Sequence, residues 1–571
     1  MTIRRHYLVG VIGVAVFACV LWMQPLLNLR LPHQVDLLVH LRWSDQFFSA
    51  LRDGWLFPRW AYASYEGLGD PTFMYYQPLF YYLTSAFAMA GMEARHALLW
   101  SALVPYFLLG AIVYLGVLRH ADRRAALIGA CFVMSCPVLL FLSAQMAAFP
   151  WVLSIPFSVL FLAESARTRP RIVYVAVLLC LVCLSHLLSG MIALFTAGFG
   201  RLILAFPNRR SLPEHVVWGT GVALGLGLAA FFIYPAVTQL QLISPSGWTE
   251  GPNFDWRRAF ALPVVTFARY GLRWAAIQWP LSLLALGMCA VTLWSARGAR
   301  SDTPQRLAFR LSVFGLTAIA LGSELAYPLY ALLPPLQKLQ FPYRFMFIGA
   351  VLGSIGVAIQ FTQGMWSRWS NAIRVIVVTL IAVYGAQAVY LQWSMHSGEP
   401  LPAHVDYMQG RFGQPEYLPA VAKPQWKMYL QNGKLQGECT RPDVKCDVVT
   451  QRANRLEVSI TAPRTTLLRM PLFAFPAWRV SVDGVRQHPL VDAQTGLILA
   501  QVGPGRHTVT IEWAGVPADT IGRDITLVTA GLLLAIIVVG RLRRGGQAAM
   551  PAQVALKSEG KSEPEPEALL P

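Results

Sequence analysis

Apolar runs of roughly 18–20 residues recur along this chain, and several of them contain no charged residue. A run of this length crosses the hydrocarbon core of a bilayer as an α-helix. Charged residues make up only 13% of the chain, whereas soluble domains carry about a quarter, and the mean hydropathy is +0.48. The sequence therefore predicts a polytopic α-helical membrane protein with about twelve transmembrane helices.

The basic residues are clustered, and the clusters flank the apolar runs. The net charge of +18 raises the question of a nucleic-acid partner, but Lys and Arg also collect on the cytoplasmic loops of membrane proteins. This positive-inside pattern explains the clusters, so no nucleic-acid partner is predicted. It places both termini in the cytoplasm and predicts an inner-membrane protein. The clusters cover residues 119–124, 167–171, 209–210, 297–306 and 541–544.

The apolar runs and their basic flanks predict an order of spans. The run 172–206 holds 35 residues, too many for one crossing, so it is divided near His186–Gly190 into two short spans. Residues 75–91 are apolar, yet a crossing there would put the cluster at 119–124 outside, and we interpret them as a helix half embedded in the outer face. The other spans are predicted at 8–26, 97–118, 125–144, 148–166, 215–235, 275–296, 307–326, 345–362, 373–392 and 524–540.

The character of the chain changes after residue 392. Apolar and polar residues alternate with a period of two in 455–461 and 507–513, which is typical of half-buried strands, and Asp483-Gly484 has the composition of a hairpin turn. Cys439 and Cys446 could form a disulfide if this region faces an oxidising compartment. The predicted domains are a membrane domain, 1–392, with a first outer loop, 27–96; a β-sandwich-like domain on the outer side, 393–518; a last transmembrane helix with its basic flank, 519–544; and a disordered cytoplasmic tail, 545–571.

The first outer loop carries the polar residues with the clearest chemical potential. Asp36 lies just past the outer end of the first span, where a carboxylate stays ionised and can act as a general base. His40 follows four residues later, on the same face of a helix. Together the two side chains could bind a hydroxyl, a phosphate or a metal ion. The alternative is that Asp36 caps the helix that follows it.

The order of short motifs along the chain resembles a known family. Asp36 is followed by Gly54-x-x-x-Pro58-Arg59-Trp60, a Gly-rich turn and Tyr76-x-Pro-Leu-x-Tyr-Tyr. This arrangement resembles the GT-C glycosyltransferases and, more closely, the bacterial YfhO-like membrane proteins and those described as 6-pyruvoyl-tetrahydropterin-synthase-related. Similar pieces lie at 184–190, 339–345, 476–484 and 503–507, so the resemblance covers most of the chain.

The resemblance implies a GT-C-like fold and an inverting glycosyltransferase that uses a polyprenyl-phosphate-linked sugar as donor. The acceptor would be a cell-envelope glycan, lipid or protein at the outer face of the bilayer. By position, Asp36 would be the catalytic base that deprotonates the acceptor hydroxyl. Glu66 and Asp70 are candidates for the second acidic motif of some GT-C enzymes, but no Asp-Asp or Asp-x-Asp stands in this loop. A divalent metal ion is thus an optional cofactor, with no ligands assigned.

Two arginines and a histidine suit a lipid-linked sugar phosphate at the membrane surface. Arg59 and Arg344 stand beside Pro and aromatic residues at outer boundaries, against the positive-inside trend. A guanidinium can hold a phosphate with two parallel hydrogen bonds, although interfacial anchoring is the alternative. His186 lies at the end of a short span, where a polar residue is a functional candidate or makes a helix–helix hydrogen bond.

Aromatic and acidic side chains complete the set of candidate substrate-binding residues. Trp60 and Tyr76 could stack on a sugar ring, or they could belong to the aromatic belts that lie at every membrane interface. Glu324 stands near the end of the span 307–326 and could face the same cavity.

Two other classes of function remain open on the sequence alone. A transporter or flippase for a lipid-linked glycan would show charges near the middle of the membrane, whereas the polar residues here gather in one outer loop. A non-catalytic assembly protein would keep the fold without turnover. Convergence of Asp36, Arg59 and Arg344 on one outer cavity would favour the enzyme.

Overall fold

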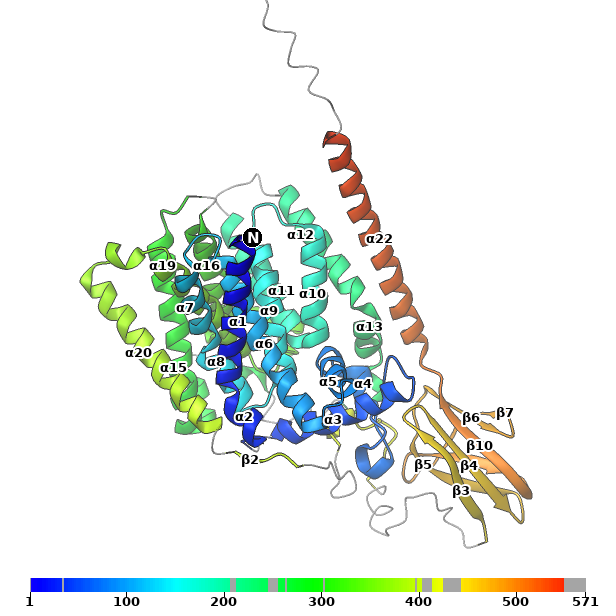
Figure 1. The fold of residues 1–571 in the computed structure, drawn as a ribbon. Coiled ribbons are helices and arrows are strands. Elements are labelled where there is room, and N and C mark those ends of the chain that lie inside the picture. Colours follow the sequence, from blue (N-terminus) through cyan, green and yellow to red (C-terminus); the bar gives the residue numbers. More distant parts are fainter. Residues whose placement is uncertain are drawn as a thin grey trace, which may run out of the picture.

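The computed structural model shows a bundle of long helices with a β-domain at one end (Figure 1). The predicted fold class, a polytopic helical membrane protein with a C-terminal β-domain, is confirmed. We call the end that carries the β-domain the loop end; the N-terminus lies at the opposite end (Figure 1). The structure describes residues 2–32, 35–205, 212–244, 255–261, 264–300, 303–395, 398–402, 413–424 and 443–548.

Within the described residues, six helices are long and apolar enough to cross a membrane, and up to nine spans result if three bent helix pairs are counted as one span each. The six are α6 (Ala94–Val117), α11 (Leu187–Ala205), α15 (Val264–Ala296), α19 (Arg344–Thr362), α20 (Asn371–Ser394) and α22 (Pro517–Ala548). The pairs are α7 (Arg123–Met134) with α8 (Pro137–Ala144), α12 (Leu212–Leu228) with α13 (Ala230–Thr238), and α16 (Pro304–Gly322) with the segment ending in α17 (Tyr327–Leu332), bent by 42°, 76° and 75°.

The prediction of about twelve spans is therefore higher than these helix lengths support. Three predicted spans form apolar helices of 17 residues or fewer: part of α1 (Thr2–Leu21), α9 (Phe149–Ser165) and α10 (Ile172–Ser185). An apolar run shows that residues avoid water, but not that they form one straight helix of about 20 residues. α5 (Leu79–Met89) has 11 residues, about 16 Å at 1.5 Å per residue; it falls in the segment predicted to be half embedded.

At the breaks between helices, the backbone either becomes extended or forms a hydrogen bond outside its own helix. The predicted division of the run 172–206 is confirmed, because α10 ends and α11 begins on either side of His186, whose backbone is extended. At the break between α12 and α13, the freed N–H of Phe231 donates to Oγ1 of Thr526 on α22 at 2.9 Å. A freed backbone group inside a bilayer needs such a partner, so α22 stabilises this kink.

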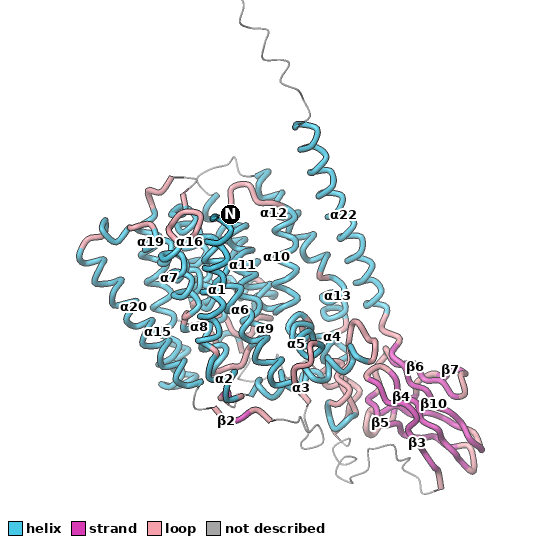
Figure 2. Tube along the Cα trace, viewed as in Figure 1, coloured by secondary structure: helices cyan, strands magenta, loops and turns pink. Residues whose placement is uncertain are grey.

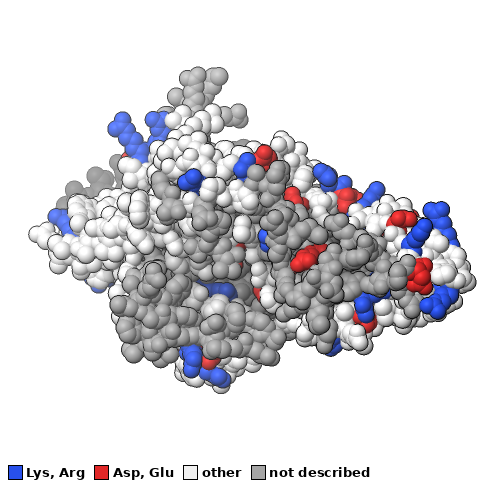
Figure 3. All heavy atoms as spheres, turned by 90° about the horizontal axis from the view of Figure 1, so that it is seen from below, with Lys and Arg blue, Asp and Glu red and all other residues white. Residues whose placement is uncertain are grey.

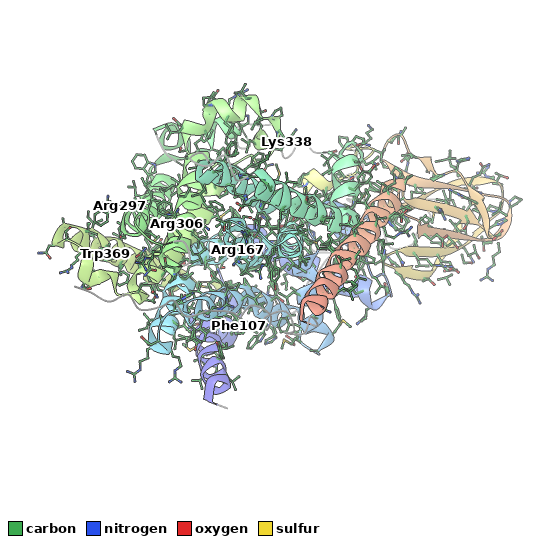
Figure 4. The ribbon with its side chains drawn as sticks, turned by 90° about the horizontal axis from the view of Figure 1, so that it is seen from above. Phe107, Arg167, Arg297, Arg306, Lys338 and Trp369 are labelled. Atoms are coloured by element: carbon green, nitrogen blue, oxygen red, sulfur yellow. The ribbon has the colours of Figure 1, made fainter. Side chains whose placement is uncertain are left out.

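The first outer loop builds the loop end. It contains the end of α2 (Met23–Asn28), then α3 (Val35–Arg52), α4 (Thr72–Tyr75) and α5; α4 and α5 lie on the side of the bundle next to the β-domain (Figure 1). β1 (Arg30–Leu31) pairs with β2 (Glu399–Pro400), which ties this loop to the chain that follows α20. The opposite end is seen from above in Figure 4, where Arg167 and Arg297 follow α9 and α15 and Arg306 begins α16. The described C-terminal end of α22 lies on that side too (Figure 1).

Eight described strands form two antiparallel sheets in the β-domain, drawn magenta in Figure 2. Buried Val458 and Leu456 pair with Val509 and Ile511, so apolar side chains alternate inward as predicted. On the face seen in Figure 3, acidic and basic side chains are interspersed over this domain. One sheet has the order β3 (Lys445–Arg452), β4 (Arg455–Ala462), β10 (Gly505–Trp513), β6 (Trp478–Val482), β7 (Val485–Gln487), and the other β5 (Thr466–Phe473), β9 (Leu497–Val502), β8 (Leu490–Val491).

Two smaller sequence predictions concern the ends of this domain. Asp483-Gly484 joins β6 to β7 with φ of 48° and 80°, so the predicted hairpin turn is confirmed. Cys446 is disulfide-bonded, but Cys439 lies outside the described residues, and their pairing stays a prediction. The predicted disordered tail lies outside them from residue 549 onward, while residues 545–548 are helical in α22.

Candidate functional site

Asp36 lies in the first turn of α3 at the loop end, near the positive end of the helix dipole. Its side chain is exposed, yet the surrounding protein removes part of its hydration and raises the pKa of Asp36 to about 6. Desolvation is the largest cause, the negative charge of Glu416 adds to it, and the positive charge of Arg344 opposes it. A carboxyl of this kind takes up a proton close to neutral pH.

Arg344 is the cation of this group. It is the first residue of α19, and its Nη1 donates a hydrogen bond to the carbonyl oxygen of Leu339 at 3.2 Å. The guanidinium carbon lies 4.8 Å from the centre of the Phe341 ring and 5.4 Å from the centre of the Trp151 ring. Among the described residues its Nε has no hydrogen-bond partner, so the guanidinium keeps donors for an anion.

Asp36, Tyr76 and Arg344 converge, although they come from three separate parts of the chain. The charges of Asp36 and Arg344 act on each other, and both act on the Tyr76 hydroxyl. Burial is the largest cause that raises the pKa of Tyr76, and Asp36 adds to it. Two of the three residues whose convergence favours an enzyme, Asp36 and Arg344, therefore lie close enough at the loop end for their charges to interact.

Along α3 from Asp36 begins a cluster of rings that we call the aromatic floor: His40, Trp43, Tyr76, Tyr81 and Tyr417. Ring centres are 4.8 Å apart between Trp43 and Tyr76 and 5.9 Å apart between Trp43 and Tyr417. His40 is buried, its Nδ1 is hydrogen-bonded to the Tyr81 hydroxyl at 2.9 Å, and burial lowers the pKa of His40 to about 3. The His40 imidazole is therefore neutral, and its hydrogen bond to Tyr81 links two residues of the aromatic floor.

His186, which lies between α10 and α11, contacts Trp151 in the same region. Its ring stacks on Trp151 with centres 5.4 Å apart, and its Nδ1 is hydrogen-bonded to Oγ of Ser189 at 2.7 Å. Trp151 is thus contacted by both His186 and Arg344. A small pocket of about 10 Å³ lies next to this group between α9, α11 and α19; Ser158 and Arg344 are among its lining residues.

The two candidates for a second acidic motif differ in their environment. Asp70 is fully buried, its backbone pairs with Ala61, and its Oδ1 accepts a hydrogen bond from the N–H of Thr72 at 2.9 Å. Burial is the main cause that raises the pKa of Asp70 to about 7, and Glu416 adds to it, while hydrogen bonds from Thr72 oppose it. Glu66 is partly exposed, with a φ of 57° in the 3-10 turn Ser64–Gly67.

Arg59 is engaged elsewhere. Its Nε lies 3.3 Å from Oδ1 of Asp519 at the start of α22, and its Nη2 donates to the carbonyl oxygen of Phe231 on α13 at 2.7 Å. Burial lowers the pKa of Arg59 and the charge of Asp519 raises it. The structure therefore does not join Arg59 to Asp36 and Arg344; it makes Arg59 a link between the first outer loop and two helices.

Trp60 packs against the β-domain and is fully buried. Its ring centre lies 5.3 Å from that of Trp478 and 5.8 Å from those of Phe475 and Trp513. A Cβ on Gly69 would meet the Trp60 indole at 1.9 Å, so the Gly-rich turn closes tightly over this ring. In this structure Trp60 therefore has no face on which a sugar could stack.

We expect Trp60→Ala to destabilise the folded protein by about 3–5 kcal/mol, because the substitution leaves a cavity between the first outer loop and the β-domain. The measurement is thermal unfolding of the detergent-solubilised protein. Trp393→Ala removes an indole that is 66% exposed and serves as the control. Equal losses of stability in the two variants would contradict the packing role of Trp60.

Glu324 lies in the 3-10 turn Glu324–Ala326 between α16 and α17. It is partly buried, and its Oε1 has no hydrogen-bond partner within the described part of the chain. It is not among the charges that act on Asp36, so the structure does not join it to this group.

Five residues of the region were not candidates from the sequence: Trp43, Tyr81, Trp151, Glu416 and Tyr417. Trp151 sits in an apolar run that gives no sign of a site. Glu416 and Tyr417 follow α20 and lie far along the chain from the loop that they contact, so no local spacing pattern could have found them. Only the tertiary fold brings them to Asp36.

The described side chains offer no preformed set of metal ligands. In the part of the chain that the structure describes, no group of three or more His, Cys, Asp or Glu side chains is arranged to hold a metal ion. We therefore assign no residue to a metal and describe the chemistry through the side chains of the chain itself.

The fold and the site define a polytopic membrane protein with an acid, an arginine and an aromatic floor at its loop end. A family model described as "6-pyruvoyl-tetrahydropterin synthase related domain; membrane protein" matches residues 73–391, more than half of the chain. The chain belongs to this family. No curated protein matches it.

Two solved structures are similar to the chain. One is ArnT from Cupriavidus metallidurans bound to undecaprenyl phosphate, with a TM-score of 0.39, 15% identity, and coverage of 67% of this chain and 62% of that chain. The other is the arabinofuranosyltransferase AftD from Mycobacteria, with a TM-score of 0.42, 14% identity, and coverage of 88% and 40%. The chain thus spans less than two thirds of either.

Proposed function

We propose that this protein is an inverting membrane glycosyltransferase that moves a sugar from a polyprenyl-phosphate-linked donor to an acceptor at the outer face of a bacterial inner membrane. The observation that carries the proposal is the convergence of Asp36 and Arg344 above the aromatic floor at the loop end. In this proposal the loop end faces outward, and the N-terminus and the end of α22 face the cytoplasm.

Each residue of the group has a role that its surroundings support. Asp36 takes the proton of the acceptor hydroxyl as the acceptor oxygen attacks the anomeric carbon. The bond between that carbon and the phosphate oxygen breaks, and polyprenyl phosphate leaves. Arg344 donates hydrogen bonds to the phosphate and stabilises the charge that develops on it. Tyr76, which is partly exposed, offers a ring face to a sugar.

Placement near the membrane suits a lipid-linked donor. Arg344 begins a transmembrane helix, so its guanidinium lies at the level where a lipid phosphate sits. The side chains of α9, α11 and α19 beside it are in part apolar, which suits the lipid end of such a donor. The direct test is the release of polyprenyl phosphate from a polyprenyl-phosphate sugar by the purified protein in lipid nanodiscs.

The rate of transfer is expected to fall in acid with a midpoint near pH 6. A general base must be ionised, and the pKa of Asp36 is raised to about 6, so kcat/KM is constant at higher pH and drops about tenfold per pH unit below the midpoint. Asp70, whose pKa is raised to about 7, is the other carboxyl that titrates in this range. An acid limb that persists in Asp70→Asn supports Asp36, and a wild-type rate that stays constant down to pH 5 contradicts its role as base.

A further inference from the structure

Residues 324–338, which we call the surface segment, lie between α16 and α19 at the loop end. α16 begins at the end seen from above in Figure 4, where Arg306 lies, and it therefore ends at the loop end. α19 begins with Arg344 a few residues after the surface segment and runs back toward the opposite end. The surface segment thus connects the ends of two helices at one level of the membrane.

The surface segment turns away from the direction of α16. The part of it that ends in α17 is bent by 75° relative to α16. Because α16 runs along the bundle, a bend of this size places α17 nearly parallel to the membrane plane. α17 has six residues, about 9 Å at 1.5 Å per residue, which is too short to cross half of a hydrocarbon core of about 30 Å.

One face of α17 is packed against the chain that precedes α15. Tyr330 is fully buried, and its ring stacks on Trp256 with centres 5.5 Å apart. The centre of the Phe260 ring lies 5.2 Å from that of Tyr330. The carbonyl oxygen of Tyr330 accepts a hydrogen bond from Nε2 of Gln337 at 2.8 Å. These contacts hold the surface segment in place and decide which of its faces points outward.

The outward face of the surface segment is apolar. Leu325 is 85% exposed, Leu332 is 77% exposed and Tyr327 is 44% exposed. Lys338 is exposed at the end of the segment. Large apolar side chains gathered on one exposed face are unfavourable in water. A short helix with such a face, a phenol ring and a cation at its edge is typical of segments that lie in the membrane interface.

Hydrogen bonds connect the surface segment and its neighbours to the start of α19. The carbonyl oxygen of Leu339, the residue after the segment, accepts a hydrogen bond from Nη1 of Arg344 at 3.2 Å. The N–H of Tyr343 donates to the carbonyl oxygen of Ala259 at 3.0 Å. The height of the Arg344 guanidinium is therefore tied to the height of the surface segment.

We propose that the surface segment docks on the phospholipid surface at the loop end and sets the depth of Arg344 in the membrane. Leu325, Tyr327 and Leu332 enter the layer of headgroups and upper acyl chains, while Lys338 faces lipid phosphates. The occupant of this face is the bilayer because the segment continues directly from a helix that lies in the bilayer. Docking requires no donor sugar, so the inference goes beyond the transferase function and is tested separately from it.

The experiment is photo-crosslinking of the full-length wild type in phosphatidylcholine nanodiscs, with adducts located by peptide mass spectrometry. One probe lipid carries a diazirine next to the headgroup, and the other carries it at the end of an acyl chain. We expect the headgroup probe to label residues 324–338 more strongly than the chain-end probe does. Leu532 and Leu534, which are exposed in the middle of α22, are expected to react mainly with the chain-end probe.

Val448 and Val449, exposed apolar residues on β3, are the matched controls in the same chain and are expected to form no adducts. Labelled α22 together with an unlabelled surface segment would overturn the inference. Equal or stronger labelling of the segment by the chain-end probe would also overturn it, because the segment would then enter the bilayer core.

A double variant, Leu325→Asp with Leu332→Asp, tests whether the apolar face makes the contact. Both side chains are exposed, so the packing of Tyr330 is retained. We expect several-fold fewer headgroup adducts in residues 324–338 and unchanged adducts in α22. Val448→Asp with Val449→Asp introduces the same charges on β3 and is expected to leave all adducts unchanged. Wild-type labelling of the segment in the Leu325/Leu332 variant would contradict the docking role of this face.

Discussion

Asp36→Asn is expected to lower the rate of polyprenyl-phosphate release by roughly 100-fold or more, because an amide cannot take the proton of the acceptor hydroxyl. Asparagine has nearly the same shape as aspartate. Asp36 is exposed in the first turn of α3, so the loss of its charge near the helix dipole changes stability by only about 0.3–1 kcal/mol. The measurement is single-turnover release at pH 8, where wild-type Asp36 is ionised.

The matched control for this variant is Asp447→Asn, which makes the same substitution at an exposed position on β3. It is expected to keep the wild-type rate. Retention of that rate by Asp36→Asn, with the wild type active, would show that another group accepts the proton.

Arg344→Gln is expected to reduce kcat/KM by one to two orders of magnitude, because hydrogen bonds to a charged phosphate contribute about 1.5–3 kcal/mol. Arg344→Lys keeps the charge but loses the planar fork, so it recovers only part of the activity. Arg344→Gln also removes a positive charge that lowers the pKa of Asp36. The acid limb of the remaining activity therefore moves to higher pH.

Steady-state kinetics with a donor that the wild type consumes measures both effects. Arg523→Gln, at an exposed arginine near the start of α22, is the control and is expected to behave as the wild type. If Arg344→Gln kept the wild-type kcat/KM and pH profile, Arg344 would have no part in donor binding.

The sequence predicts the helical architecture well, because membrane-spanning helices appear in it as long apolar runs. The division of the run 172–206 at His186 is correct, since 35 residues exceed one crossing. The apolar runs alone do not fix the number of membrane spans, because α9 and α10 are apolar but short. Hydropathy reports the environment of residues, while helix length depends on where the backbone turns.

The candidate site is only partly predictable for a different reason. Asp36 stands out because it lies just past the outer end of the first predicted span, and Arg344 because a cation there runs against the positive-inside trend. Arg59 satisfies the same criterion, yet it pairs with Asp519 in α22, a partner far along the chain. Glu416, whose charge acts on Asp36, follows α20 and is likewise far along the chain from it. Such contacts between distant parts of the chain depend on tertiary packing, so the spacing of residues along the sequence does not predict them.

The most direct measurement is the release of polyprenyl phosphate by the wild-type protein in lipid nanodiscs, with a panel of polyprenyl-phosphate sugars and a cell-envelope extract as the source of acceptors. The proposed function predicts that at least one donor is consumed, that polyprenyl phosphate appears in equal amount, and that Asp36→Asn blocks its release. If no donor of the panel is consumed while the protein remains folded, the glycosyltransferase proposal is contradicted.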